Sequence, residues 1–429
     1  MATCQQMPFT YEAYRDLLAL LKKHGYEFKG YDDHEASRRP VILRHDIDFD
    51  IGKALAMAEL EADEGVRSTY FVLLRTDFYN PFELRSAKRL RRMAALGHGV
   101  GLHFDETQYE GAVDAPAAIR READVLEGLL GLPVECVSMH RPSKAALEAD
   151  WSIPGMANSY SKELFEGFEY VSDSRRRWRK PVREIVQGGG CSRLHILTHP
   201  FWYNETEASL GESLARFAGK ASADRMSSLD RNFTDLDEAI DPGSLVQARL
   251  ASLRCERFET NRLVLRPLRL EDAADMFEYT SRAEVSRFLN WHPHREAGEA
   301  RAWIASKLSR PEPDDLLLGM ELARDRRLIG TVRAYRFDAL ERSCEISYAL
   351  NPDFQGCGYM TEALQRLVGV CLEELRMKRV VACIDEDNAA SEHVARRLGM
   401  AQAEGGDFAA SIKGESRLQH TFALERGPR

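Results

Sequence analysis

Two aspartates spaced one residue apart, Asp46 and Asp48, directly follow the apolar run 41–43 and the pair 44–45. The run is too short for a helix and rich in branched residues, so it predicts a buried parallel strand. Acids at the carboxyl end of such a strand lie where α/β folds place their chemistry. Because residues two apart in an extended chain point the same way, both carboxylates can converge on one site, one as a metal ligand and one as a base. A charged strand-to-helix turn is the alternative.

More polar clusters follow the later predicted strands. They are His103, His140-Arg141, Asp173 and His199. Strands that alternate with helices indicate a parallel sheet or barrel. Their carboxyl ends share one face, so the joint occurrence of these clusters favours a single catalytic site over unrelated turn residues.

Residues 35–205 resemble the polysaccharide deacetylase family, also called the NodB homology domain. The resemblance implies a distorted (β/α) barrel with Asp46 as the base and Asp48 as a metal ligand. It also implies two histidine ligands four residues apart. The first position is His103, whereas the second is Thr107.

The missing ligand must therefore come from elsewhere, with Asp105, Glu106 and His140 as the candidates. We favour His140, because it ends an adjacent predicted strand. A bound Zn²⁺, or another divalent metal, would lower the pKa of its water from ~15.7 toward ~7 and polarise an amide carbonyl.

The same resemblance implies roles for three further residues. Arg141 holds the base or the developing negative charge, Asp173 orients Arg141, and His199 acts as the general acid for the leaving amine. For Asp173 a helix cap is the alternative. The basic run 175–180, which includes Trp178, is either a solvated loop or a phosphate clamp with a stacking face.

A second motif begins at residue 355 and reads Gln355-Gly356-Cys357-Gly358-Tyr359-Met360. It lies between a predicted strand and a predicted helix. Free N–H groups and the dipole at a helix N-terminus bind pyrophosphate, and glycine permits close approach.

Residues 257–426 resemble the GNAT acetyltransferases, in particular the branch with the ribosomal-protein N-terminal acetyltransferases. The resemblance implies an α+β fold with a mixed, mostly antiparallel sheet and acetyl-CoA as acetyl donor. It also implies that Asn388 and Ser391 flank the pantetheine arm. Met360 departs from the usual Gly or Ala. Glu345 is either the general base or a surface strand acid, and Tyr359 serves packing or chemistry.

The composition is that of a soluble globular protein of two to three domains, with 429 residues and a net charge of −9. The charge argues against a dedicated nucleic-acid binder. No apolar run is long enough to span a membrane, no secretory signal is visible, and the eight scattered cysteines fit a reducing cytoplasm. The expected divisions are a metal-hydrolase domain over 1–230, a helical linker over 231–256 and a GNAT domain over 257–429.

The sequence also predicts the elements that carry these motifs. Helices are expected over 8–24, 51–64, 82–96, 116–130, 271–279, 297–308 and 388–399, and strands over 41–47, 68–74, 134–139, 193–198, 262–268, 316–322, 328–335, 344–350 and 379–384.

Together the two motifs predict a bifunctional enzyme that removes one acyl group from nitrogen and adds another. An amino sugar with two nitrogens, nucleotide-linked or of the nonulosonic-acid type and destined for surface glycan, reconciles the opposed activities. The alternative is a single GNAT acetyltransferase, acting on a sugar or a protein N-terminal amine, fused to a degenerate deacetylase-like sugar-binding module. Two separate substrates are a further option.

Overall fold

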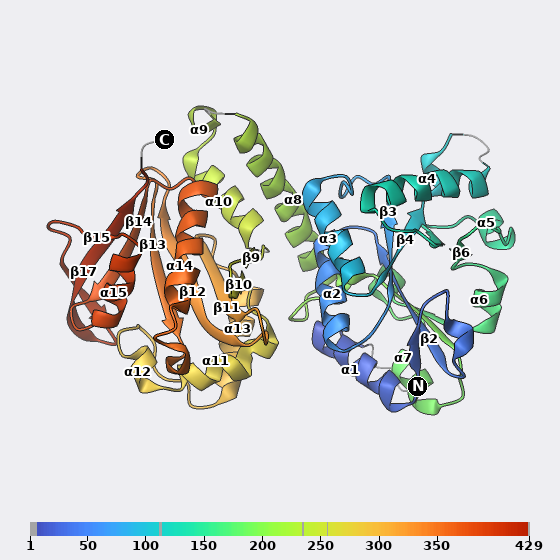
Figure 1. Ribbon diagram of the computed structural model, residues 1–429, viewed down its shortest axis with the longest axis horizontal. Helices are drawn as coiled ribbons and strands as arrows, with labels where there is room; N and C mark the ends of the chain where they lie inside the picture. The colour runs from blue at the N-terminus through green and yellow to red at the C-terminus, as the bar shows by residue number, and fades with distance from the viewer. Residues whose placement is uncertain (1–6, 111–113, 234–235, 255, 428–429) are drawn as a thin grey trace. The chain divides into compact units, whose positions relative to one another are not determined.

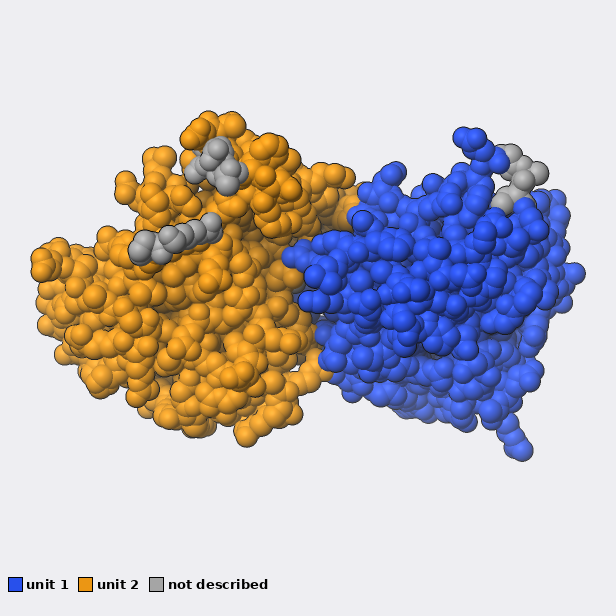
Figure 2. All heavy atoms as spheres, turned by 45° about the horizontal axis from the view of Figure 1, so that its top comes forward, with its two compact units in different colours: residues 1–210 blue, residues 211–429 orange. Residues whose placement is uncertain are grey.

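The computed structural model describes the chain except residues 1–6, 111–113, 234–235, 255 and 428–429. It divides into two compact units, Met1–Leu210 and Gly211–Arg429 (Figure 2). The division falls earlier than the expected boundary at residue 230. No described helix is long and apolar enough to cross a membrane.

The first unit is built on a parallel sheet in the order β6-β5-β4-β3-β2-β8-β7, with β1 paired to β2 (Figure 1). The strands are β1 (Glu27–Lys29), β2 (Pro40–Ile47), β3 (Thr69–Leu73), β4 (Gly99–Phe104), β5 (Cys136–Met139), β6 (Ala157–Asn158), β7 (Glu169–Ser172) and β8 (Leu194–Thr198). The sheet curls as a half-barrel, and within the described residues its edges β6 and β7 do not pair. The expected barrel is therefore open.

Helices connect these strands, as the alternating pattern predicted. They are α1 (Tyr11–Lys23), α2 (Ile51–Asp63), α3 (Leu84–Ala95), α4 (Ala115–Leu130), α5 (Lys144–Glu148), α6 (Lys162–Gly167) and α7 (Val182–Gly188). Thr10 caps α1, and Gly97 follows α3 with φ +95°, in the left-handed conformation that ends a helix. Apolar residues of α2, α3 and α4 pack on one face of the sheet.

Strand β2 positions the aspartates. All eight of its residues are buried, and it lies between β3 and β8. Its alternation sends Ile47 into the core under α2, so Asp46 points into the concave side of the sheet. The chain then turns through Asp48, and Asp50 caps α2 by accepting from the backbone N–H of Gly52 at 2.7 Å.

The second unit has a mixed sheet in the order β15-β17-β14-β13-β12-β11-β10-β9, with β16 paired to β17. Its strands are β9 (Phe258–Glu259), β10 (Leu263–Arg266), β11 (Asp315–Leu322), β12 (Leu328–Asp338), β13 (Ser343–Leu350), β14 (Arg379–Asp385), β15 (Ala401–Gln402), β16 (Phe408–Ile412) and β17 (Glu415–Glu425). All pairings are antiparallel except β13 with β14. This agrees with the expected mixed sheet.

Its helices begin at the division with α8 (Leu210–Asn232). The others are α9 (Leu236–Ala239), α10 (Pro242–Leu253), α11 (Ala273–Thr280), α12 (Ala283–Ser286), α13 (Ala297–Ser309), α14 (Tyr359–Gly369) and α15 (Ala389–Arg397). The segment expected as a linker contains α10, whose Val246, Leu250 and Leu253 pack into the core of this unit. The β16–β17 hairpin had not been predicted.

The parallel pair β13–β14 separates soon after it forms. Residues 343–345 pair with 379–381, and within the described chain no pairing between the two strands continues toward Leu350 and Asp385. Helix α14 follows β13 and helix α15 follows β14, so both helices begin on the side where the strands part.

Candidate functional site

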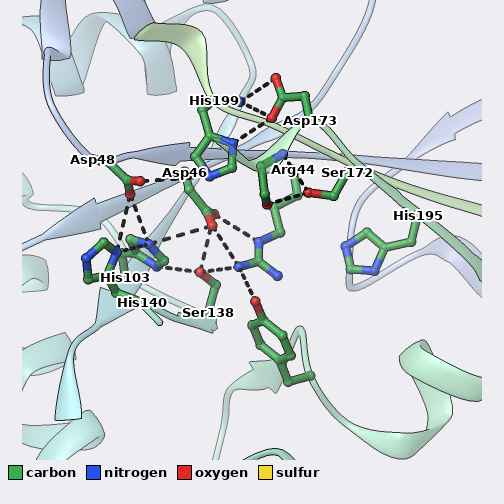
Figure 3. Close-up of polar contacts among 12 residues, drawn as sticks. Arg44, Asp46, Asp48, His103, Ser138, His140, Ser172, Asp173, His195 and His199 are labelled. Atoms are coloured by element: carbon green, nitrogen blue, oxygen red, sulfur yellow. Dashed lines mark hydrogen bonds and ion pairs between the residues drawn. The ribbon is translucent and has the colours of Figure 1, made fainter. Parts of the chain in front are cut away.

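At the carboxyl edge of the first unit's sheet, Asp48, His103 and His140 point toward one another (Figure 3). Asp48 Oδ1 lies 3.3 Å from His103 Nε2 and 3.5 Å from His140 Nδ1, and the two histidine nitrogens are 3.2 Å apart. They come from the end of β2, from β4 and from the end of β5. The structure therefore brings together the three residues expected as metal ligands.

The donor set fits a divalent metal. Tetrahedral bonds of ~2.0–2.2 Å place ligand atoms about 3.4 Å apart. Asp48 Oδ1 is buried and has no hydrogen-bond partner among the described residues. Ser138 Oγ lies 2.6 Å from His103 Nδ1 and fixes the ring from the far side, as residues behind a metal ligand do.

The two alternative ligands are turned away. Asp105 accepts from the backbone N–H of Thr107 at 3.0 Å, and Glu106 accepts from the backbone N–H of Ser143 at 2.6 Å. Asp105 thus serves a local turn, whereas Glu106 binds the segment that follows β5, and neither carboxylate belongs to the cluster of Asp48, His103 and His140.

Asp46 is held by an arginine that the sequence analysis missed. Arg44 is fully buried and donates to both carboxylate oxygens, from Nε at 2.9 Å and from Nη2 at 2.8 Å, and Nη2 also lies 2.9 Å from Ser138 Oγ (Figure 3). Burial alone would raise the pKa of Asp46, but the charge and hydrogen bonds of Arg44, together with the charges of His103 and His199, outweigh it and keep that pKa below its ordinary value.

Arg141 is exposed and has left-handed backbone with φ +48°, and its other expected role, holding the developing negative charge, stays a prediction. Its expected role of holding the base is corrected, since Arg44 fills it. The physical reason is register. Arg44 stands two residues before Asp46 on one strand, so both side chains share the concave face. That spacing, an arginine two residues before the first acid, was the available signal in the sequence.

Asp173 orients His199, and this corrects its expected pairing with Arg141. Asp173 is buried; its Oδ1 accepts from His199 Nδ1 at 2.6 Å, and its carboxylate accepts from the backbone N–H of His199 at 3.1 Å. Burial lowers the pKa of His199, but the Asp173 carboxylate outweighs it and raises that pKa to about 9. His199 Nε2 lies 3.8 Å from Asp48 Oδ2, so the imidazole faces the cluster.

Of the two alternatives for the basic run 175–180, a solvated loop or a phosphate clamp with a stacking face, the structure does not provide the stacking face. Trp178 is buried, so its ring offers no free face, and Lys180 is paired with Glu169 at 2.5 Å. Trp178 instead belongs to the packing of the first unit.

The second unit gathers its expected residues around the start of α14. Gly356 and Gly358 have φ of +76° and +80°, which glycine adopts freely, and Gln355, Gly356 and Cys357 are exposed. The loop leads directly into Tyr359, the first residue of α14. Because the first four N–H groups of a helix lack intrahelical partners, this end can bind a phosphate.

Arg262, which was expected only as the first residue of the predicted strand 262–268, stabilises this loop. Its guanidinium donates to Cys357 O at 2.9 Å and to Glu362 Oε2 at 2.7 Å, and lies 4.6 Å from the centroid of the Tyr359 ring. Tyr359 therefore packs under Arg262. Met360 is buried in the core. Its side chain, larger than the usual Gly or Ala, therefore does not occupy the exposed loop.

Asn388 and Ser391 stand at the start of α15. Asn388 Oδ1 accepts from the backbone N–H of Ser391 at 3.2 Å and so caps the helix. Tyr348 of β13 donates through its hydroxyl to Ser391 O at 3.3 Å, which links β13 to the first turn of α15.

Glu345 lies at the last paired position of β13 and β14, where the strands begin to part. Its neighbours Cys344 and Ile346 point into the core, so Glu345 points to the opposite face. Tyr335 donates to one of its oxygens, and Arg336 donates to the other at 2.9 Å.

The sequence of the second unit matches known acetyltransferases. Residues 262–401 match the acetyltransferase (GNAT) domain family. The N-acetyltransferase p20 of Bacillus licheniformis is 30% identical over 138 residues, which cover 32% of this chain and 77% of p20. The chain belongs to the GNAT acetyltransferase family. Its GNAT unit is an N-acetyltransferase domain.

Two further similarities concern this family. The spermidine N(1)-acetyltransferase of Escherichia coli (strain K12) is 23% identical over 160 residues, covering 37% of this chain and 77% of that protein. The solved structure of the microcin C7 self immunity acetyltransferase MccE, in complex with acetyl-CoA and AMP, aligns at 20% identity with a TM-score of 0.35. It covers 39% of this chain and 94% of that chain. The resemblance of residues 35–205 to polysaccharide deacetylases stays a prediction.

Proposed function

We propose that the GNAT unit transfers the acetyl group of acetyl-CoA to a primary amine. The observation that carries this is the parted strand pair β13–β14, with the glycine-rich start of α14 on one side and the start of α15 on the other. A long acyl-CoA thioester has a pyrophosphate for the helix N-terminus and a pantetheine amide chain for the unpaired strand edges.

In this proposal Glu345 takes a proton from the acceptor nitrogen. It is the carboxylate at the point where the strands part, and it faces away from the core. The N-acetyltransferases similar to this chain include a spermidine enzyme, which supports an amine acceptor. A protein N-terminal amine or an amino sugar has the same nucleophile.

The experiment is isothermal titration of acetyl-CoA into the full chain, followed by thiol release with a panel of primary amines. Acetyl-CoA binding that is weakened at least tenfold in Gly358→Val supports the proposal, because a branched side chain strains the φ of +80° at the loop. Gly414→Val is the matched control, since Gly414 has φ +88° in the remote β16–β17 turn. Absence of acetyl-CoA binding to the natural chain contradicts it.

A second activity is proposed for the first unit, namely metal-dependent hydrolysis of an N-acetyl group on an amino sugar. The observation that favours it is the convergence of Asp48, His103 and His140 beside the Arg44–Asp46 pair. A bound divalent ion would supply an acidified water and a polarised carbonyl. Asp46 would then accept a proton, and His199, held by Asp173, would give one to the leaving amine.

The substrate proposed for both units is one amino sugar carrying two nitrogens, nucleotide-linked or of the nonulosonic-acid type. The competing proposal keeps only the acetyltransferase active and makes the first unit a sugar-binding module. Elemental analysis of the purified chain separates them. About one equivalent of zinc, lost in Asp48→Ala and in His140→Ala, supports the hydrolase. A chain that takes up no metal when zinc is supplied supports the binding module.

A further inference from the structure

Strand β12 is irregular where it passes the candidate base. Its register against β13 shifts between Tyr335 and Asp338, and Arg336 has left-handed backbone with φ +53°. In a regular strand adjacent residues point to opposite faces, so Tyr335 and Arg336 could not both reach one acid. A bulge re-aims a side chain, and here it brings Arg336 round to the face of Glu345.

The resulting cluster is uneven in its exposure. The Glu345 side chain is only 15% exposed, whereas that of Arg336 is 70% exposed. Tyr335 donates to one carboxylate oxygen, and Arg336 Nη1 lies 2.9 Å from the other. A carboxylate removed this far from water needs a cationic or hydrogen-bonded partner. The guanidinium, by contrast, is well solvated and loses little when it leaves.

The bulge costs more conformational free energy than the Arg336–Glu345 ion pair is expected to return in stability. A non-glycine residue in left-handed backbone is unfavourable, and an ion pair with one solvated partner contributes weakly to stability. Strained conformations of this kind collect at functional sites. The partner of Glu345 is therefore expected to serve the site more than the sheet.

We infer that Arg336 occupies the position that the ammonium of the acceptor takes, and that the acceptor is a cationic amine that displaces Arg336 from Glu345. Arg336 thus covers the carboxylate until a competing cation arrives. This inference rests on the proposed acetyl transfer and names its substrate class.

The chemical step that follows is balanced. The bound ammonium passes one proton to Glu345 and becomes a free amine. Its nitrogen attacks the thioester carbonyl, a C–N bond forms and the C–S bond breaks. The second nitrogen proton goes to the leaving thiolate, giving an acetamide and the CoA thiol, and Glu345 returns its proton to solvent.

The test compares Arg336→Gln with Arg324→Gln, which removes an arginine of nearly equal exposure, 71%, that pairs with its neighbour Asp325 at 3.3 Å. Putrescine, spermidine and glucosamine are titrated into the full chain with and without CoA, and KM and kcat are measured with acetyl-CoA. We expect Arg336→Gln to tighten Kd and lower KM for at least one amine about five- to tenfold. Arg324→Gln leaves both unchanged, and Arg336→Lys retains the natural affinity.

Glu345→Gln in the Arg336→Gln background removes the gain, because the receiving charge is gone. Unchanged or weakened affinity of Arg336→Gln for all three amines overturns the inference. It would mean that the Arg336–Glu345 pair only stabilises the bulge in β12. Thermal midpoints of the variants show whether folding is retained, and Arg336→Met, which keeps the long side chain but removes its charge, is held to the same two outcomes if Arg336→Gln unfolds. Failure of acetyl-CoA to bind contradicts the proposed function separately, since amine affinity is measured without it.

Discussion

The two units build their candidate sites from different materials. In the first unit, side chains from the ends of β2, β4, β5 and β8 converge, from Asp46 to His199 along the chain. In the GNAT unit, the backbone of one short loop and the start of one helix form the site. A side-chain site depends on buried charge pairs that must be positioned by distant strands. A backbone site depends on local φ angles and on a helix end, so it is carried by a contiguous motif.

The largest effect is expected from breaking the buried pair that supports the first site. Arg44→Leu leaves Asp46 buried without its cation, and losing one partner of such a pair costs about 3–5 kcal/mol. Calorimetric unfolding of the full chain measures it. Arg67→Leu removes an exposed arginine paired with Asp32 and is the control, with an expected loss below about 1 kcal/mol. Equal losses of unfolding free energy in both variants would show that the buried Arg44–Asp46 pair contributes no more to stability than an exposed ion pair.

Acid should weaken the first unit through Glu61. This buried carboxylate accepts from Tyr14, His45, Ser68 and Tyr70. Burial raises its pKa, but the charge of His45 and these hydrogen bonds outweigh it and lower that pKa to about 2. The folded state therefore binds fewer protons than the unfolded state between about pH 4.5 and pH 2.

The stabilisation by Glu61 is complete above that window and is lost as the pH falls through it, by about 3 kcal/mol in total. Urea unfolding of the chain at pH 6, 4 and 3 measures the loss. Glu61→Gln should flatten the profile over that range. A profile as steep in Glu61→Gln as in the natural chain would refute the assignment.

An intermediate effect is expected from Ser138→Ala. Ser138 holds His103 from behind, and loss of such a partner lowers metal affinity about 10–100-fold. Competition titration with a zinc chelator measures the affinity. Ser161→Ala, which removes only the cap of α6, should leave it unchanged. Unaltered zinc affinity in Ser138→Ala would mean that the histidine is positioned by the strand alone.

The smallest effect is expected from Arg262→Gln in the GNAT unit. It removes the donor to Cys357 O and the partner of Glu362, but leaves the glycines that shape the loop. We expect KM for acetyl-CoA to rise about threefold, which corresponds to a modest hydrogen-bond contribution of about 0.7 kcal/mol. Arg324→Gln serves again as the control. A loss of a hundredfold would show that side chains, and not the loop backbone, dominate this site.

Some helices and strands could be predicted from the sequence and others could not. The strand that carries Asp46 and Asp48, the helix that begins after Asp50, and the strand-loop-helix around Gly358 were all predicted, because apolar period, caps and glycines act locally. The β16–β17 hairpin was missed, although Lys413-Gly414 and the alternation that follows were a usable signal.

Partner choice within the sites was decided by tertiary structure. The family resemblance implied that Asp173 orients Arg141, whereas the curled sheet brings Asp173 to His199 and leaves Arg141 exposed. Likewise Trp178 had been considered as a stacking surface, but packing buries it. Which residues meet across a sheet depends on strand order and register, and neither is encoded in local spacing.

The sequence by itself thus determined the chemistry available to this protein: two acids after a buried strand, histidines at later strand ends, and a glycine turn at a helix start. Only the tertiary structure decided which of these groups face one another. It placed His140 beside Asp48 and His103, paired Asp46 with Arg44, and turned Arg336 onto Glu345. The physical reason is that residue type and period act over a few residues, whereas convergence requires strands distant in sequence to pair in one register.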